Sequence, residues 1–261
     1  MDGISRAPAS TVRTRVGAAE WEMRVKLAAC YRLVERYGMS DMVYTHISAR
    51  VPGGEEHFLL NPYGMLYREI TASSLVKVDL EGRVVDAPDE SLGLGINPAG
   101  FVIHSAVHAA RPDVECVIHT HTRAGIAVSA MKCGLLPLSQ HAMRFHERIG
   151  YHDYEGPALE DDEKPRLVAD LGDRTSLILR NHGLLVCGPT VEQAFNTLYW
   201  LEMACKAQVD AMASGAELAM PSVETARKTA RRYDPDVRVF GLREWPALLR
   251  MLDAADPSYR D

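Results

Sequence analysis

The sequence contains no apolar run that approaches the roughly 18 residues needed to cross a membrane. No apolar segment follows the N-terminal arginines Arg6, Arg13 and Arg15 either, so we expect no secretory signal and no membrane partner. Positive charge is not in excess, because 29 Lys and Arg residues face 35 Asp and Glu residues and the formal net charge is -6. This balance does not favour nucleic acid as a partner.

Cysteine pairs are also lacking. The five cysteines are odd in number, scattered, and without a Cys-x-x-Cys motif, which is typical of reduced, mostly buried thiols in a cytoplasmic protein. With 261 residues, 47% of them hydrophobic and 25% charged, the chain is expected to form one large globular domain, the alternative being two small ones.

Hydrophobic periodicity and turn residues predict an α/β fold. Apolar spacing predicts a helix over 20–37, and Asn97 with Pro98 predicts the start of another that ends near Ala110. Strands are expected at 42–51, 57–61, 75–80, 116–121, 176–180 and 184–187. Because strands first cluster and then interleave with helices, we expect a mixed or mainly antiparallel sheet between helical layers.

The two ends of the chain are expected to differ from this central part. Residues 1–18 are predicted to be a flexible N-terminal arm, and a C-terminal helical extension is predicted from 216 to 261. The extension is basic at Arg227, Lys228, Arg231 and Arg232, which favours a solvated helix face over a subunit contact.

Three histidines form a candidate metal site. In a strand, His119 and His121 would lie on one face about 7 Å apart, from twice the ~3.3 Å rise. His182 follows a second β-rich run, and three imidazoles would leave a fourth position open for water or substrate. Three neutral ligands also leave an ion's double charge in place, which suits polarising a carbonyl or stabilising an enediolate. The alternative is that these are hydrogen-bonded core histidines.

A second pair, His104 and His108, has the spacing of a helical metal pair. No glutamate stands between them in the metalloprotease order, so they are predicted to be packing or helix-surface histidines.

From about Glu20 to Gly215 the sequence resembles the class II aldolase/adducin family, and within it the adducin head domain. The stretches that carry this resemblance are Glu56–Leu59, Thr71–Lys77, Ala99–Phe101, His104–Ala106, Ala109–Val114, Val128–Pro137 and Ile178–Gly183. The resemblance implies a domain over 19–215 with a three-layer α/β/α fold. It also implies a homotetramer with sites at subunit boundaries, and a zinc-dependent retro-aldol or related lyase reaction in the enzymes. His119, His121 and His182 stand in the family's metal-ligand positions.

Two family motifs are altered here. A Ser-Ser-Glu run supplies an acid/base glutamate in the enzymes, and the corresponding residues are Pro98-Ala99-Gly100. The Gly-Asn-x-Ser phosphate loop becomes Thr45-His46-Ile47-Ser48, so a non-phosphorylated substrate is expected. A proton-donating tyrosine from a neighbouring subunit falls near His141. His141 and His46 are therefore the candidate acid/base residues, because histidine titrates near neutral pH.

Two functions remain open. The first is a divalent-metal-dependent lyase, with zinc as the expected ion, that cleaves a carbon-carbon bond or decarboxylates a small carbonyl or carboxylate substrate. The second is an inactive adducin-like binding or assembly module. Adducin's cytoskeletal contacts depend on a lysine-rich tail that this sequence lacks, so no cytoskeletal partner is predicted. The intact ligand set favours the enzyme.

Overall fold

The computed structural model describes residues 10–54, 56–87, 95–156 and 161–261, and a single eight-stranded sheet lies at its centre. The strand order is β4-β3-β2-β1-β5-β8-β7-β6. The strands are β1 (His46–Arg50), β2 (Phe58–Leu60), β3 (Val76–Val78), β4 (Val84–Asp86), β5 (Cys116–Thr120), β6 (Gly150–His152), β7 (Ser176–Leu179) and β8 (Gly183–Gly188). Described neighbours pair antiparallel, except for the parallel pair β6 and β7. The predicted mixed, mainly antiparallel sheet is confirmed.

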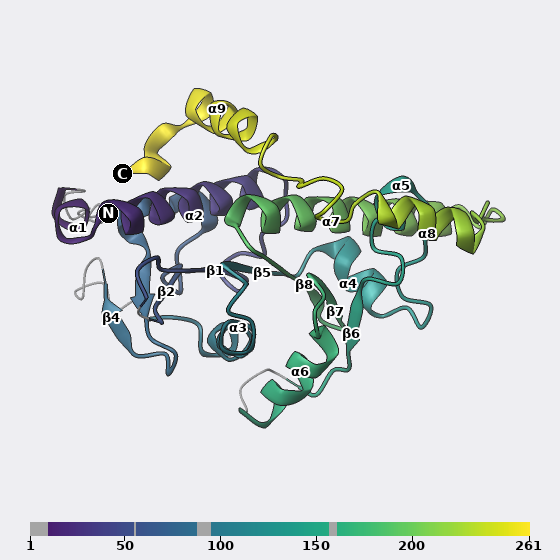
Figure 1. The fold of residues 1–261 in the computed structure, drawn as a ribbon, viewed down its shortest axis with the longest axis horizontal. Helices are drawn as coiled ribbons and strands as arrows, with labels where there is room; N and C mark the ends of the chain where they lie inside the picture. Colours follow the sequence, from purple (N-terminus) through teal and green to yellow (C-terminus); the bar gives the residue numbers. More distant parts are fainter. Residues whose placement is uncertain (1–9, 55, 88–94, 157–160) are drawn as a thin grey trace.

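Helices cover both faces of this sheet (Figure 1). On one face lie α2 (Ala18–Arg36) and α7 (Val191–Ala213), and on the other lie α3 (Pro98–Ala110) and α6 (Lys164–Leu171). The remaining described helices are α1 (Ser10–Arg15), α4 (Arg123–Ser129), α5 (Gln140–Met143), α8 (Val223–Arg231) and α9 (Trp245–Ala255), with short 3-10 turns η1 (Tyr67–Glu69), η2 (Ala72–Ser74), η4 (Asp161–Glu163) and η5 (Pro257–Arg260). This arrangement confirms the predicted three-layer α/β/α fold.

Alternation along β5 divides its side chains between two hydrophobic clusters. Cys116 and Ile118 belong to the cluster that includes α2 and α7, whereas Val117 belongs to the cluster with α3 and α6. Because side chains alternate along a strand, His119 projects to the same side as Val117. The sheet therefore presents the first candidate ligand on the face that α3 covers.

The predicted flexible arm is wrong for its last residues. Residues 1–9 lie outside the described residues, but Ser10–Arg15 forms α1 and Val12 is buried. The Arg13 guanidinium lies 5.6 Å from the centre of the Trp21 ring, and Arg15 forms an ion pair with Asp86 at 3.1 Å. These contacts order the segment, and the contact with Asp86 joins residues that are remote in sequence, so a local pattern does not reveal it.

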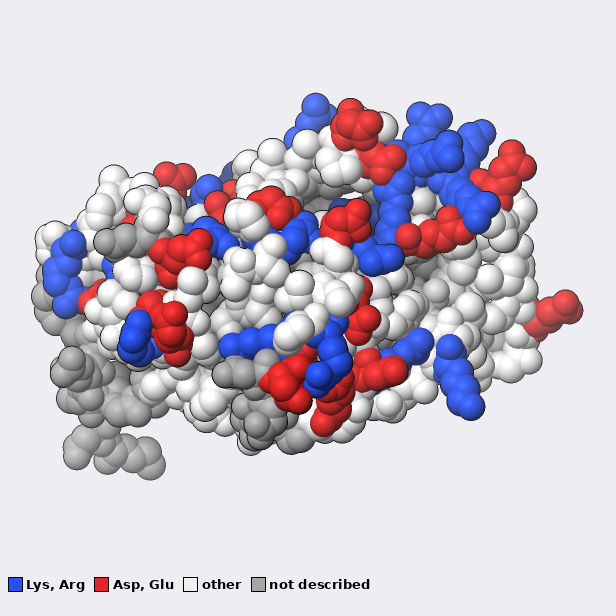
Figure 2. Space-filling model, turned by 60° about the horizontal axis from the view of Figure 1, so that its bottom comes forward, with Lys and Arg blue, Asp and Glu red and all other residues white. Residues whose placement is uncertain are grey.

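The C-terminal segment carries the helices α8 and α9, and it packs into the main core. Trp245, Leu252 and Tyr259 are buried in the same cluster as α2. Figure 2 shows a group of basic side chains toward the upper right of the face drawn, with acidic side chains among them. On α8, Arg227 pairs with Glu147 at 2.6 Å. Among the described helices, none is both long and apolar enough to cross a membrane.

Candidate metal centre

The turn between β7 and β8 brings His182 beside β5. β8 pairs with β5 so that Thr120 lies opposite Leu184, and the turn precedes Gly183 directly. A Cβ atom at Gly183 would lie 2.3 Å from the Thr120 carbonyl oxygen, so only glycine allows this approach. Asn181 adopts a positive φ of 55°, a conformation that asparagine tolerates better than most residues.

The structure brings the three predicted ligands together. The Nε2 atom of His121 lies 2.8 Å from Nε2 of His119 and 2.9 Å from Nε2 of His182. The group is a set of ligand atoms that all lie within 4.8 Å of one another. One ion could therefore contact three imidazole nitrogens at once.

The partners of the other ring nitrogens test whether a metal ion fits. Nδ1 of His119 donates to the Leu184 carbonyl oxygen at 3.0 Å, and Nδ1 of His121 lies 3.1 Å from the Asp41 carboxylate. With both protons on Nδ1, both Nε2 atoms present lone pairs to each other at 2.8 Å, which is repulsive unless a cation lies between them. Metal-bound histidines characteristically have such carbonyl and carboxylate partners. The donor set therefore fits a divalent metal ion.

Burial also keeps the rings of His119 and His182 in the unprotonated form, which is the form that binds metal. It is the main reason why the pKa of His119 is well below its ordinary value, and it lowers the pKa of His182 to about 4. A metal ligand must be unprotonated at the coordinating nitrogen. Both rings are therefore ready to bind at neutral pH.

Asp41 is a site residue that the sequence analysis missed. It lies 80 residues before His121 and follows no recognisable motif; the neighbouring Met42 has a positive φ of 45°. A positive φ at methionine is uncommon and marks a tight local turn. The sequence offers no local signal for this contact.

His46 lies next to the three histidines and fills the space above Gly100. It pairs with His119 across β1 and β5, and the two ring centres lie 5.1 Å apart. A Cβ atom at Gly100 would lie 2.3 Å from Cδ2 of His46 and 2.5 Å from its Nε2. The imidazole therefore occupies the volume that any larger side chain at residue 100 would enter.

His104 and His108 belong to a buried hydrogen-bonded chain that begins at His46. Nδ1 of His46 lies 2.8 Å from Nε2 of His104, whose Nδ1 lies 2.6 Å from the Ser48 hydroxyl. The same hydroxyl lies 2.8 Å from Nε2 of His108, which stacks on Phe58. All four residues of this hydrogen-bonded chain are at most 5% exposed. The two helical histidines are packing residues, as one alternative predicted, and do not lie on the helix surface.

His141, the other predicted acid/base residue, lies apart from the three histidines of its own subunit. Its ring stacks on Trp200 with the centres 4.2 Å apart, and partial burial lowers its pKa. Within the chain, then, the structure brings His46 but not His141 to the three histidines.

A surface pocket of about 580 Å³ lies beside His182. It is lined by residues 129–132, Asp153, Tyr154, Arg180 and Asn181. The Tyr154 ring centre lies 6.2 Å from that of His182. Arg180 donates to the Met131 carbonyl at 2.7 Å and lies over the Tyr151 ring, without a described carboxylate partner. Lys132 is a second cation of this pocket and is exposed.

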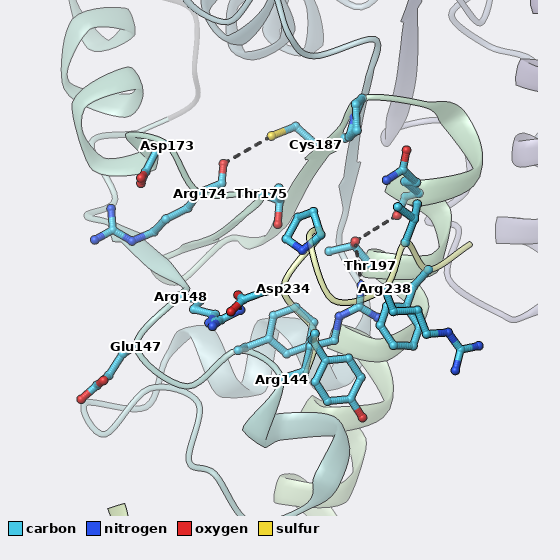
Figure 3. A pocket seen from close by; sticks show the side chains of 18 residues that line it. Arg144, Glu147, Arg148, Asp173, Arg174, Thr175, Cys187, Thr197, Asp234 and Arg238 are labelled. Carbon is cyan, nitrogen blue, oxygen red and sulfur yellow. Dashed lines mark hydrogen bonds and ion pairs between the residues drawn. The ribbon is translucent and has the colours of Figure 1, made fainter. Parts of the chain in front are cut away.

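A different cavity, of about 520 Å³, lies where the loop after α8 meets the sheet and α7 (Figure 3). In Figure 3, Arg148 and Asp234 point toward each other, and they pair at 2.5 Å. Arg144 donates to Asn196 at 2.9 Å and lies among four aromatic rings. These contacts tie the loop to the core, and none of the described lining residues is one of the three histidines.

Comparison with known proteins supports the fold described above. A solved aldolase II superfamily protein from Pseudomonas syringae is 54% identical and superposes with a TM-score of 0.91, covering 96% of this chain and 100% of that one. The L-fuculose 1-phosphate aldolase from Glaciozyma antarctica is 27% identical with a TM-score of 0.81, covering 98% of this chain and 96% of its own.

Alpha-adducin of Rattus norvegicus is 46% identical over 244 residues, which are 88% of this chain and 33% of the adducin. Residues 25–209 match the family model described as Class II Aldolase and Adducin N-terminal domain. The resemblance predicted from the sequence is confirmed: the chain belongs to the class II aldolase and adducin N-terminal domain family.

Proposed function

We propose that this protein is a divalent-metal-dependent lyase of the aldolase type. It would cleave a carbon-carbon bond, or decarboxylate, a small non-phosphorylated carbonyl or carboxylate substrate. The observation that carries the proposal is the convergence of three Nε2 atoms. In His119 and His121 the Nδ1 atom faces a hydrogen-bond acceptor, which places the ring proton on Nδ1 and leaves Nε2 free to bind an ion. A divalent ion, with zinc as our expectation, would supply Lewis acidity that polarises a carbonyl and stabilises an enolate.

The residues of the chain divide the remaining work. His119, His121 and His182 would hold the ion, and Asp41 and the Leu184 carbonyl contact two of those rings and keep them in orientation. His46 moves the proton. In a retro-aldol cleavage its ring would accept the proton of the β-hydroxyl as the carbon-carbon bond breaks, and would return that proton to the carbon that the cleavage releases.

Substrate choice follows from what lies around the centre. His46 replaces the asparagine of the phosphate loop that the enzymes of the family carry, so phosphate recognition is not expected here. The Glaciozyma relative is named for L-fuculose 1-phosphate, which is a property of that protein. In the pocket beside His182, Lys132 and Arg180 offer two cations to a substrate carboxylate.

We further propose a cytoplasmic homotetramer, as the family resemblance implies. In that assembly His141 would assist proton transfer across a subunit boundary, since it does not reach the three ligands within its own chain.

Metal content per subunit is the measurement that tests this function. The protein should be purified without chelator or nickel resin, together with His119→Ala, His182→Ala and the control His57→Ala, which precedes β2. About one ion per chain in wild type and control, lost in both ligand variants, would support the metal role. Wild-type protein that takes up neither zinc nor manganese would refute it.

Turnover is tested next, with hydroxy-ketones, aldehydes and carboxylates offered to the metal-loaded protein. The second candidate function, an adducin-like assembly module, is favoured by the 46% identity to alpha-adducin. A metal-loaded protein that turns over none of these compounds, and whose oligomeric state is unchanged by His119→Ala, would favour the module over the enzyme.

A further inference from the structure

A surface cavity of about 900 Å³ lies between α5, α7 and α8. Its aromatic lining is Trp200, Tyr233 and Phe240, and its charged lining comes from α8, the loop after α8 and the start of α9. α5 packs against both α7 and α8, so the helices that frame the cavity are in direct contact. Its described lining shares no residue with the three histidines or with the pocket beside His182. The cavity is therefore separate from the candidate metal centre.

Positive charge in this cavity is not balanced by its own carboxylates. Lys228 and Arg232 are exposed, and neither forms an ion pair with a described carboxylate. They lie four residues apart, a spacing at which like charges on a helix repel each other. The third cation, Arg238, lies 3.9 Å from Glu244, which is the carboxylate of the described lining. Three cations against one carboxylate leave two positive charges for a bound anion.

Arg227, on the same helix, shows what a balanced cation looks like here. Its Nε and a terminal nitrogen contact the two carboxylate oxygens of Glu147 at 2.8 and 2.6 Å. Arg227 is not part of the described lining of the cavity. The cavity is thus formed by cations of α8 that lack such a partner.

The Tyr233 hydroxyl is a third donor at the cavity. It accepts a hydrogen bond from Nε2 of Gln140 at 3.1 Å, and its own hydrogen has no acceptor among the described residues. A hydroxyl group can accept and donate at the same time. Lys228, Arg232 and Tyr233 therefore offer hydrogen-bond donors to a ligand group that has several oxygens.

A further cation lies beside the aromatic residues without lining this cavity. The guanidinium carbon of Arg144 lies 5.5 Å from the centre of the Tyr233 ring and 5.3 Å from that of Phe240. Its polar partners, Asn196 and Thr197, are neutral, and burial lowers its pKa to about 10. Its charge is therefore not cancelled locally and adds to the positive potential of this region.

A phosphate group fits these donors better than a single carboxylate does. Near neutral pH a phosphate monoester carries close to two negative charges and three strong acceptor oxygens. A carboxylate carries one charge and two oxygens. Both lysine and arginine are common phosphate ligands. The charge and the number of donors at this cavity therefore favour phosphate.

We propose that this cavity binds a small molecule that carries a phosphate or diphosphate group, held by Lys228, Arg232 and Tyr233. The inference goes beyond the proposed lyase function and does not depend on it. Free pyrophosphate and a nucleoside diphosphate share this chemistry, and the base of the latter would contact the aromatic lining.

Isothermal titration calorimetry of the full-length protein with sodium pyrophosphate tests the proposal. Lys228→Gln and Arg232→Gln should each weaken binding roughly tenfold, which is the value of one charge-assisted hydrogen bond. Arg231→Gln is the matched control, because Arg231 is an exposed cation of the same helix that does not line the cavity. It should change the affinity by less than about twofold. Absence of binding, or an equal loss in Arg231→Gln, would overturn the proposal.

His119→Ala separates this site from the metal centre. Pyrophosphate should still bind to that variant, and loss of binding there would overturn the proposal by placing the anion at the three histidines. Equal affinity for sodium citrate would overturn the assignment to phosphate. Tighter binding of adenosine diphosphate than of pyrophosphate would identify a nucleotide as the ligand, whereas equal or weaker binding would identify the diphosphate group alone.

Discussion

The contact between His46 and Gly100 predicts that Gly100→Ala destabilises the protein, although alanine is normally the better helix residue. Gly100 is the third residue of α3, where an exposed Gly→Ala change would stabilise by about 0.5–1 kcal/mol. Here the new Cβ would lie 2.3 Å from the His46 ring. Ordinary carbon contacts are about 3.5 Å or longer. The ring must therefore yield by about 1 Å.

Yielding is costly because the ring is fixed. Rotation of His46 would break its 2.8 Å hydrogen bond to His104, and the ring is buried. Overpacking of this kind costs about 1–3 kcal/mol, which exceeds the helix gain. The net loss in the free energy of unfolding is on the order of 1 kcal/mol, which lowers the melting temperature by about 2–4 °C.

The assay is chemical and thermal unfolding of four proteins: wild type, Gly100→Ala, His46→Ala and the double variant. In the His46→Ala background the clash is absent, so Gly100→Ala should stabilise by about 0.5–1 kcal/mol. The sign of the same substitution thus reverses, with a coupling of about 1–3 kcal/mol. Gly95→Ala, with open space around its Cβ position, should change stability by less than about 0.5 kcal/mol. Stabilisation by Gly100→Ala in the wild type would refute the reasoning.

Three further predictions concern the metal, acid stability and a buried ion pair. Asp41→Asn should weaken metal affinity about 10–100-fold in a chelator competition, because the carboxylate orients His121; an unchanged affinity would argue against that role. Burial lowers the pKa of His108 from 6.5 to about 3, so the unfolded chain binds the proton first. The contribution of His108 to the free energy of unfolding should therefore be complete above pH 6.5 and be lost as the pH falls toward 3. In urea titrations, His108→Gln should make this loss of stability smaller. Arg24 is fully buried against Glu20 and two backbone carbonyls, so Arg24→Met should cost about 3–5 kcal/mol, and a loss below 1 kcal/mol would contradict its paired role.

The convergence of His119, His121 and His182 was predictable because local rules place these residues. Period-two alternation predicts His119 and His121 on one side of an extended segment, although β5 itself ends at Thr120. A turn of Asn, His and Gly is a recognisable break between two strands. The helix over α3 was likewise marked by its N-terminal Asn97 and Pro98. Such signals depend on neighbours within a few residues, and a sequence displays those directly.

The long-range contacts around the three histidines were not predictable. Asp41 reaches His121 across 80 residues, and the His46 to His104 contact spans 58. The His46 contact depends on the register of β1 against β5 and on how α3 packs over these strands. The helical spacing of His104 and His108 predicts packing or helix-surface histidines; their burial selects packing, and only the structure shows that Ser48 joins them. A single sequence therefore does not show which distant segments lie side by side, or in which register they pair.

The residues at positions 46 and 100 bear on the charge of the substrate that the centre can accept. In the aldolases that this chain resembles, a glutamate corresponds to Gly100, whereas here the His46 ring fills that space. Burial holds the pKa of His46 well below its ordinary value, so the ring is neutral at neutral pH. A site with three neutral ligands and a neutral base has one negative charge fewer than a site with a glutamate. It repels an anionic substrate less, and Lys132 and Arg180 beside His182 add positive charge. The altered motif is thus compatible with the carboxylate substrate that we propose.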